Sequence, residues 1–275
     1  MQFDATNPYH RRRLHYESDH QLSLPELIAR NSADATTAAV VWCLLEHRAS
    51  YIIAGPTDPT PGVGKTTTLN ALLPFYPAGT GLVYTLGMYE DFAFLPEVPP
   101  AETTVLANEV SDHLSIYMWG RSARKFLRLP RQGFAIATSC HADTLKDVLT
   151  ILTDDIRLTT PDIQRLQLIV NIGLHGRVWP QKRRWMTTHF VLPANADPAA
   201  TSPTLQMISC WDETTDTFLP PDATTIAAMA AWAGISSEAF QTEVQRRATV
   251  LSELAAQQAD QHTTMLALQT FREEG

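Results

Sequence analysis

The sequence predicts an α/β fold with a central, mostly parallel β-sheet and a helical C-terminal segment. Two observations support this prediction. Short apolar runs typical of buried strands alternate with stretches at helical spacing, which is the pattern of parallel sheets. Several of these runs also end in a residue that can do chemistry, as expected at the carboxyl edge of such a sheet. The 275 residues suffice for one large domain or two small ones.

The predicted elements follow one another along the chain. Residues 1–22 form a polar, basic lead-in arm, and two short helices follow within 22–50. The run YIIAG at 51–55 predicts a buried strand, and a helix begins at Lys65, just after the glycines. These elements give a lead-in region (1–50), an α/β core (51–220) and a C-terminal helical segment (221–275). Further strands are predicted at 81–91, 103–110 and 133–143, a strand pair at 166–178 and 183–192, helices at 144–156 and from about 222 onward, and a loop at 193–204.

Composition and charge exclude several classes of protein. The chain is 44% hydrophobic and 18% charged, which is ordinary for a globular protein. Its formal net charge of −8 argues against a nucleic-acid partner. Cys43, Cys140 and Cys210 are far apart, so they predict neither a disulfide framework nor a zinc site. Residues 1–20 lack the apolar core of a signal peptide, and we expect a cytoplasmic protein.

The stretch AGPTDPTPGVGKTTTLNALL resembles a phosphate-binding P-loop, G-x-x-x-x-G-K-[ST], with one irregularity. Lys65 and Thr66 end the motif as expected, but Pro59 stands at the position of the first glycine. Gly55 supplies that glycine if residues 58–61 are an insertion at the tip of the loop. Such an insertion would bulge away from the backbone N–H groups that hold phosphate, so we interpret the stretch as a nucleotide site. A surface turn that contains Gly-Lys-Thr by chance is the alternative.

A P-loop holds phosphate with backbone N–H groups at the start of a helix that follows a buried strand. The chain supplies the strand, the glycine turn and the helix in that order. We therefore expect ATP and Mg²⁺ as cofactors, with Lys65 reaching the β- and γ-phosphates and the Thr66 hydroxyl on Mg²⁺. The residues predicted to bind the nucleotide at the loop are Gly62, Val63, Gly64, Lys65, Thr66 and Thr67.

Together with its surroundings, the loop resembles the ATPases that power type II and type IV secretion, type IV pilus assembly and archaellum rotation. LVYTLGMYEDFAFL looks like the acidic box of that family, with its Glu-Asp pair at Glu90 and Asp91. TTVLANEV looks like the Walker B strand, with Glu109 at the acidic position, and GFAIATSCHADTLKDVLTIL matches the histidine box at His141. The resemblance covers about residues 10–275. It implies a RecA-like P-loop ATPase core without the separate N-terminal domain of the family.

The resemblance also implies roles for these residues. Glu109 is expected to orient the attacking water, and His141 to sense the γ-phosphate. Glu90 is expected at the catalytic centre, and Asp91 on Mg²⁺ or its waters. An acidic turn and a structural histidine are the alternatives. Arg12 and Arg13 belong to a basic stretch that lies near the nucleotide in this family; a solvated run of arginines is the alternative there.

Some positions depart from the family pattern. The segment between Glu90 and Glu109 is shorter than usual, and Ser111 stands where the family has an arginine. A second basic cluster precedes the histidine box instead, and it could replace the lost cations, contact a partner or coat a helix. Its members are Arg121, Arg124, Lys125, Arg128 and Arg131.

The leading hypothesis is a motor subunit that couples ATP hydrolysis to secretion or filament assembly at the cytoplasmic membrane face. The resemblance implies a homo-oligomer, a hexameric ring, with a membrane platform protein of a secretion or pilus system as its partner. The second hypothesis is a nucleotide-binding accessory subunit with little hydrolysis, which Ser111 favours. A small-molecule kinase would need an acceptor-binding lid that the sequence does not suggest. A helicase would need interleaved aromatic and basic residues, which are also lacking.

Overall fold

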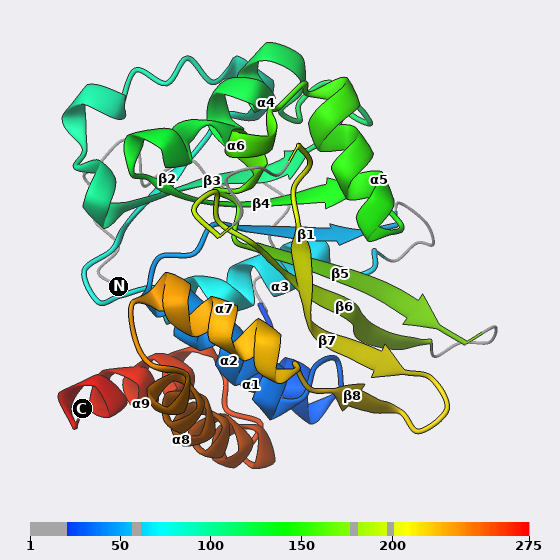
Figure 1. Cartoon of the computed structure of the whole chain (residues 1–275), viewed down its shortest axis with the longest axis vertical. Coiled ribbons are helices and arrows are strands. Elements are labelled where there is room, and N and C mark those ends of the chain that lie inside the picture. The colour runs from blue at the N-terminus through cyan, green and yellow to red at the C-terminus, as the bar shows by residue number, and fades with distance from the viewer. Residues whose placement is uncertain (1–20, 57–61, 177–180, 197–200, 275) are drawn as a thin grey trace.

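An eight-stranded β-sheet with helices on both faces forms the centre of the molecule (Figure 1). The computed structural model describes residues 21–56, 62–176, 181–196 and 201–274. The strands lie in the order β2-β3-β4-β1-β5-β6-β7-β8. Their bounds are Tyr51–Gly55 (β1), Gly81–Tyr84 (β2), Thr103–Val110 (β3), Ala135–His141 (β4), Leu168–His175 (β5), Lys182–Val191 (β6), Leu205–Asp212 (β7) and Thr217–Leu219 (β8).

The sheet has a parallel part and an antiparallel part. Strands β2, β3, β4, β1 and β5 are parallel to one another. Strands β6, β7 and β8 extend the sheet in antiparallel fashion. The predicted α/β class is therefore confirmed, as is the parallel sheet for the strands that carry the predicted site. Because parallel strands end at one edge, β1, β3 and β4 bring their carboxyl ends together there.

Strand β1 occupies the middle of the parallel part, between β4 and β5. All its residues are buried, which matches its continuous apolar sequence and is typical of a parallel strand covered on both faces. The strand ends at Gly55, where a Cβ atom would lie 2.8 Å from the carbonyl oxygen of Ile172 in β5. Only glycine fits this close approach, and it fixes the point at which the chain leaves the sheet.

Two groups of helices cover the sheet (Figure 1). Helices α1 (Leu24–Ala29), α2 (Ala35–Glu46) and α3 (Lys65–Leu72) share one core cluster with α7 (Ala223–Ala233), α8 (Ser237–Ala256) and α9 (Gln261–Glu273). Helices α4 (Gly120–Leu127), α5 (Leu145–Thr150) and α6 (Thr160–Ile163) contribute to the second cluster, on the opposite face. Single 3₁₀ turns lie at Leu73–Phe75, Gly87–Tyr89, Leu95–Glu97, Pro100–Glu102 and Leu129–Gln132, and one π-helical turn at Ile151–Asp155.

The lead-in helices and the C-terminal helices form one packed layer. The ring of Trp42 in α2 lies 4.7 Å from that of Phe271 in α9, measured between centroids. Glu46, at the end of α2, accepts hydrogen bonds from Arg247 in α8 (2.6 Å) and Arg272 in α9 (3.0 Å). The first core cluster therefore runs across the predicted boundaries after residues 50 and 220.

Three details differ from the predicted elements. The strand predicted at 81–91 ends at Tyr84, and a turn follows in which Gly87 has a φ of +61°. Strands β7 and β8 were not predicted; β7 buries Ile208, Ser209 and Trp211, and β8 has no fully buried residue. The helix predicted at 144–156 changes to a π-helical turn after Thr150.

Among the described residues, no helix is long and apolar enough to span a membrane.

Candidate functional site

The glycine turn leads directly into helix α3, at the carboxyl edge of the sheet. Gly64 has a φ of +102°, in the left-handed region that favours glycine, and it is the N-cap of α3. Within the described part of the chain, no side-chain capping hydrogen bond is found at this end of the helix. The first N–H groups of a helix have no partner within the helix, and together with the helix dipole they favour an anion. The local geometry therefore suits the phosphate-binding role predicted for this turn.

Lys65, the first residue of α3, is buried, with 8% of its surface exposed. Its Nζ donates a hydrogen bond to the carbonyl oxygen of Pro56 (3.1 Å) and lies 2.9 Å from Nδ1 of His141. Burial lowers the pKa of Lys65, because it disfavours the charged amine, and the nearby carboxylate of Glu109 opposes this effect. The amine is thus held at the loop in a position where a phosphate would compensate its loss of solvation.

Glu109 reaches the site through an irregularity in β3. Ala107 pairs with Thr138 and Val110 with Cys140, so that β3 has one more residue than β4 in this interval. The carbonyl oxygen of Asn108, within this interval, accepts a hydrogen bond from the hydroxyl of Ser139 (2.7 Å). Bulges of this kind redirect a side chain at the end of a strand and are frequent near active sites.

The Glu109 carboxylate lies beside His141, the last residue of β4. Oε1 of Glu109 is 2.6 Å from Nε2 of His141. The contact is short, but it is not aligned as a hydrogen bond, and Oε1 has no well-aligned donor among the described residues. A buried carboxylate oxygen in this condition can accept a hydrogen bond from a water or a ligand group. This property fits the water-orienting role predicted for Glu109.

The ring of His141 contacts both Lys65 and Glu109, and one placement of the ring proton fits both contacts. A protonated amine can only donate, so Nδ1 of His141 must accept from Lys65. The proton of a neutral imidazole then resides on Nε2, which faces the carboxylate of Glu109. The structure therefore brings together three of the predicted site residues, from α3, β4 and β3.

A hollow of about 290 Å³ lies beside His141 and is lined by residues of two other segments. Ser111 and Asp112 follow β3, and Asp155 belongs to the π-helical turn. His113, which was not predicted at the site, packs edge-on against His141 with 5.3 Å between ring centroids. Single π-helical turns occur frequently at functional sites. A His three residues after a predicted strand end was the only signal that sequence inspection could have used for His113.

The acidic pair after β2 has other partners. Both carboxylate oxygens of Glu90 accept backbone hydrogen bonds, from Leu86 (2.9 Å) and Phe92 (2.7 Å). Asp91 is exposed, and its carboxylate accepts a hydrogen bond from the backbone of Ala93 (2.9 Å). Strands β3 and β4 separate β2 from β1 in the sheet. Among the described contacts, the carboxylate of Glu90 stabilises the turn after β2, and none of them links it to Lys65; its place at the catalytic centre stays a prediction.

The remaining loop residues lie at the start of α3. Thr66 is exposed and Thr67 half-buried, whereas Val63 is buried under the turn. Gly62 is exposed, and nothing lies within 4 Å of the position that a Cβ would take on it. Arg12, Arg13 and the inserted residues 58–61 lie outside the described residues.

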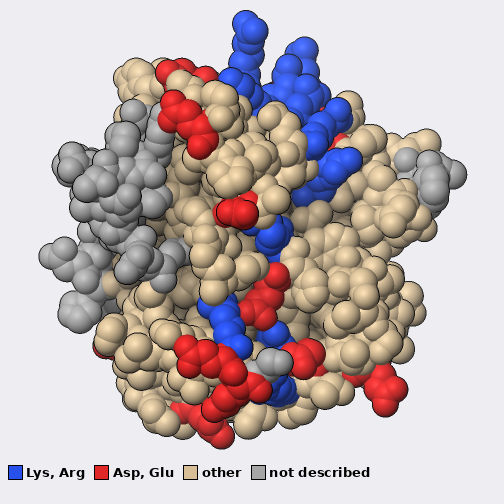
Figure 2. Space-filling model, turned by 90° about the vertical axis from the view of Figure 1, so that its left-hand side faces the viewer, with Lys and Arg blue, Asp and Glu red and all other residues tan. Residues whose placement is uncertain are grey.

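The second basic cluster lies away from the loop, around α4. Figure 2 shows Lys and Arg side chains gathered at the top of one face, the end of the molecule at which α4 and α6 lie in Figure 1. Several of these groups have structural partners. Arg124 donates to the carbonyl oxygen of Ile156 (2.5 Å), and both Arg128 and Arg131 pair with the buried Asp162. Burial favours the neutral form of Asp162, but hydrogen bonds from Thr159 and from these arginines lower its pKa overall.

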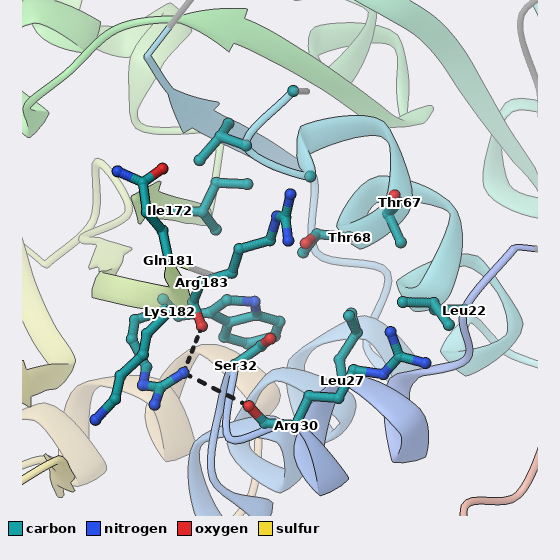
Figure 3. Close-up of a pocket in the computed structure, with 15 residues that line it drawn as sticks. Leu22, Leu27, Arg30, Ser32, Thr67, Thr68, Ile172, Gln181, Lys182 and Arg183 are labelled. Carbon is teal, nitrogen blue, oxygen red and sulfur yellow. Dashed lines mark hydrogen bonds between the residues drawn. The ribbon is translucent and has the colours of Figure 1, made fainter. Parts of the chain in front are cut away.

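A cavity of about 430 Å³ opens on the other side of the loop (Figure 3). It lies between the glycine turn, the first residues of β6 and the region of α1. No sequence-based prediction placed Arg183, at the start of β6, at the site, although it lines this cavity beside Gly64. The run Lys182-Arg183-Arg184 at the start of a predicted strand was the available signal.

Comparison with known proteins does not identify the chain. No protein-family model matches it, and no curated protein matches it significantly. The resemblance to secretion and pilus ATPases therefore depends on the motifs alone.

Proposed function

We propose that the chain binds and hydrolyses ATP as a motor subunit that powers protein secretion or pilus-like filament assembly at the cytoplasmic membrane face. One observation carries the ATPase part of this proposal. At the helix N-terminus that follows the glycine turn, Lys65 lies within hydrogen-bonding distance of His141, and His141 lies within that distance of Glu109. The motor part rests on the resemblance of the surrounding motifs to a RecA-like secretion ATPase core.

The residues divide the work of phosphoryl transfer. The backbone N–H groups from Gly62 to Thr66 and the amine of Lys65 would hold the phosphates, and the carboxylate of Glu109 would orient the attacking water. His141 would keep the amine and the carboxylate in register. Thr66, which is exposed, would hold Mg²⁺ through its hydroxyl. The ion would supply positive charge that compensates the charge of the phosphates.

The test separates binding from turnover. Lys65→Ala removes the amine that faces the phosphates, so the affinity for ATP should fall about 30-fold or more. Glu109→Gln keeps the amine and removes only the carboxylate that orients water, so turnover should fall about 100-fold with affinity nearly unchanged. Calorimetric ATP titration and phosphate release measure the two effects.

Matched controls are Lys146→Ala and Glu102→Gln, which change exposed residues of the same types. Both controls should behave like the unchanged protein. An equal loss of affinity in the Lys65 and Glu109 variants would contradict the division of roles, and unchanged affinity after Lys65→Ala would contradict the nucleotide site itself.

The alternative function is an ATP-binding accessory subunit with little hydrolysis. Its support is the hydroxyl of Ser111, which accepts a hydrogen bond from the backbone of His113 (3.0 Å) at the position where the related ATPases carry an arginine. Without that cation, charge on the leaving γ-phosphate is less well compensated. Tight ATP binding without measurable turnover in any assembly state would favour this alternative.

A further inference from the structure

The cavity beside the loop lies on the opposite side of β1 from Glu109 and His141. Strand β1 has β4 as one neighbour and β5 as the other. Glu109 and His141 belong to β3 and β4, whereas the cavity is lined by Ile172 of β5 and by the first residues of β6. A ligand on the glycine turn therefore has one end near His141 and the other end near the cavity.

The cavity is positively charged, although the chain carries a formal net charge of −8. Among its described lining residues are Arg30, Lys182, Arg183 and Arg184, and none is an Asp or a Glu. Two of these cations are already neutralised, because Lys182 (2.8 Å) and Arg184 (2.9 Å) pair with Asp216. In the described part of the chain, neither Arg183 nor Arg30 makes a side-chain hydrogen bond or ion pair.

Arg183 lies beside the glycine turn. Its Cδ lies 3.8 Å from the position that a Cβ would occupy on Gly64. Figure 3 shows its side chain extending toward Thr68 and the start of α3, whereas the side chain of the neighbouring Lys182 points away. The guanidinium can thus reach an anion held at the turn, and its planar fork suits two phosphate oxygens.

The rest of the cavity suits a flat, partly apolar group. Leu22, Leu27 and Ile172 line it together with Trp185. Trp185 is 2% exposed, and its indole Nε1 has no hydrogen-bond partner among the described residues. The volume of about 430 Å³ lies in the range of small-molecule sites.

From these observations we infer that the cavity holds the nucleoside part of a nucleoside di- or triphosphate, and that Arg183 contacts its phosphate chain beside Gly64. The terminal phosphate then faces Lys65 and His141. This inference rests on the proposed nucleotide site and adds the direction in which the nucleotide lies across it. It also adds a cation supplied from β6 of the same subunit, outside both basic clusters of the sequence.

The test compares Arg183→Ala and Arg183→Lys with the control Arg165→Ala, which changes an exposed arginine outside the cavity. The probes are ATP and inorganic tripolyphosphate, which has the phosphate chain without the nucleoside. Arg183→Ala should weaken both probes about tenfold or more, because a charge-assisted, two-point contact is lost. Arg183→Lys should lie in between, since one charged group replaces the fork, and Arg165→Ala should bind both probes like the unchanged protein.

Each of the other possible results contradicts one part of the inference. If Arg183→Ala weakens ATP but not tripolyphosphate, the guanidinium does not contact the phosphate chain. If neither probe is weakened, Arg183 has no role in binding. These failures differ from failure of the proposed function, in which the unchanged protein itself would bind ATP no better than Lys65→Ala.

A second measurement places the nucleoside. ATP should change the tryptophan fluorescence of the protein, and tripolyphosphate should not, because only ATP puts a base beside Trp185. Trp185→Phe should bind ATP and lose most of that change. An equal change with both probes, or no change with ATP, would place the nucleoside outside the cavity.

Discussion

At the scale of single residues, His141 is the link on which the candidate site depends. It contacts the amine of Lys65 through one ring nitrogen and the carboxylate of Glu109 through the other. Without the ring, a buried amine and a buried carboxylate would be free to approach each other, and each would leave the position suited to its role.

Replacing His141 tests this link. His141→Ala should lower turnover about 100-fold, the scale expected when catalytic groups are misplaced by about 1 Å, while ATP affinity changes little. His141→Gln should recover part of the loss, because a side-chain amide can accept from Lys65 and donate to Glu109. Steady-state phosphate release and ATP titration measure both. Unchanged turnover in His141→Ala would show that the ring is only structural.

Lys65, Glu109 and His141 could be predicted from the sequence for a physical reason. Lys65 follows a glycine turn, and Glu109 and His141 end apolar runs, so topology alone places them at one edge of the sheet. Arg183 begins a strand instead, and antiparallel pairing with β5 brings it to the same edge. Whether a strand continues a sheet parallel or antiparallel depends on tertiary pairing, which a single sequence does not specify.

At the scale of secondary-structure elements, Glu46 joins three helices. Its carboxylate accepts hydrogen bonds from Arg247 of α8 and Arg272 of α9. Burial favours the neutral form of Glu46, but the two arginines outweigh it and lower the pKa below the ordinary value of 4.5. A carboxyl with a lower pKa in the folded state stabilises the fold above its unfolded pKa.

Glu46→Gln should therefore lower the free energy of unfolding by about 2 kcal/mol at pH 7, since it removes the carboxylate partner of Arg272 and one of the two carboxylate partners of Arg247. The difference from the unchanged protein should shrink as the pH falls below 4.5 and through the lower folded pKa, because Glu46 then becomes neutral in both states. Urea unfolding at several pH values measures this. The exposed Glu253→Gln is the control, and a pH-independent difference would contradict the ionic origin.

The elements differ in how well the sequence specifies them. Strand β1 is buried throughout and helix α2 from Thr37 to Leu45, and both were predicted from their apolar runs. Strands β7 and β8 were missed, because buried and more exposed positions do not alternate regularly along β7, and β8 has no fully buried residue. The bulge in β3 was also beyond prediction, since it depends on the register with β4.

At the scale of the whole molecule, the described arginines differ in their distance from the candidate site and in whether they have structural partners. Arg183 is next to the loop, whereas Arg124, Arg128 and Arg131 have structural partners around α4. Arg121 is exposed on that helix. A cation from a neighbouring subunit can raise the rate of phosphoryl transfer about a thousandfold or more.

If the chain works as a ring, turnover per subunit should rise with protein concentration or with added membrane partner. Changing Arg12 and Arg13 to Ala, or Arg121 to Ala, should reduce that rise and leave ATP affinity nearly intact, because these groups would act only across the interface. Turnover assays over a dilution series, with light scattering for the assembly state, measure this. Fast, concentration-independent turnover in a verified monomer would contradict it.

The layer shared by early and late helices also affects how the chain is made. Trp42 in α2 is buried partly by Phe271 in α9, near the other end of the described residues. At ribosomal rates of about 5–20 residues per second, roughly 10–50 s separate the synthesis of these two side chains. The strand, the turn, Glu109 and His141 are all synthesised in the first half of this interval, while the apolar face of α2 still lacks its cover. The nascent chain is therefore most exposed to aggregation and to chaperones after these site residues have been synthesised and before α9 covers α2.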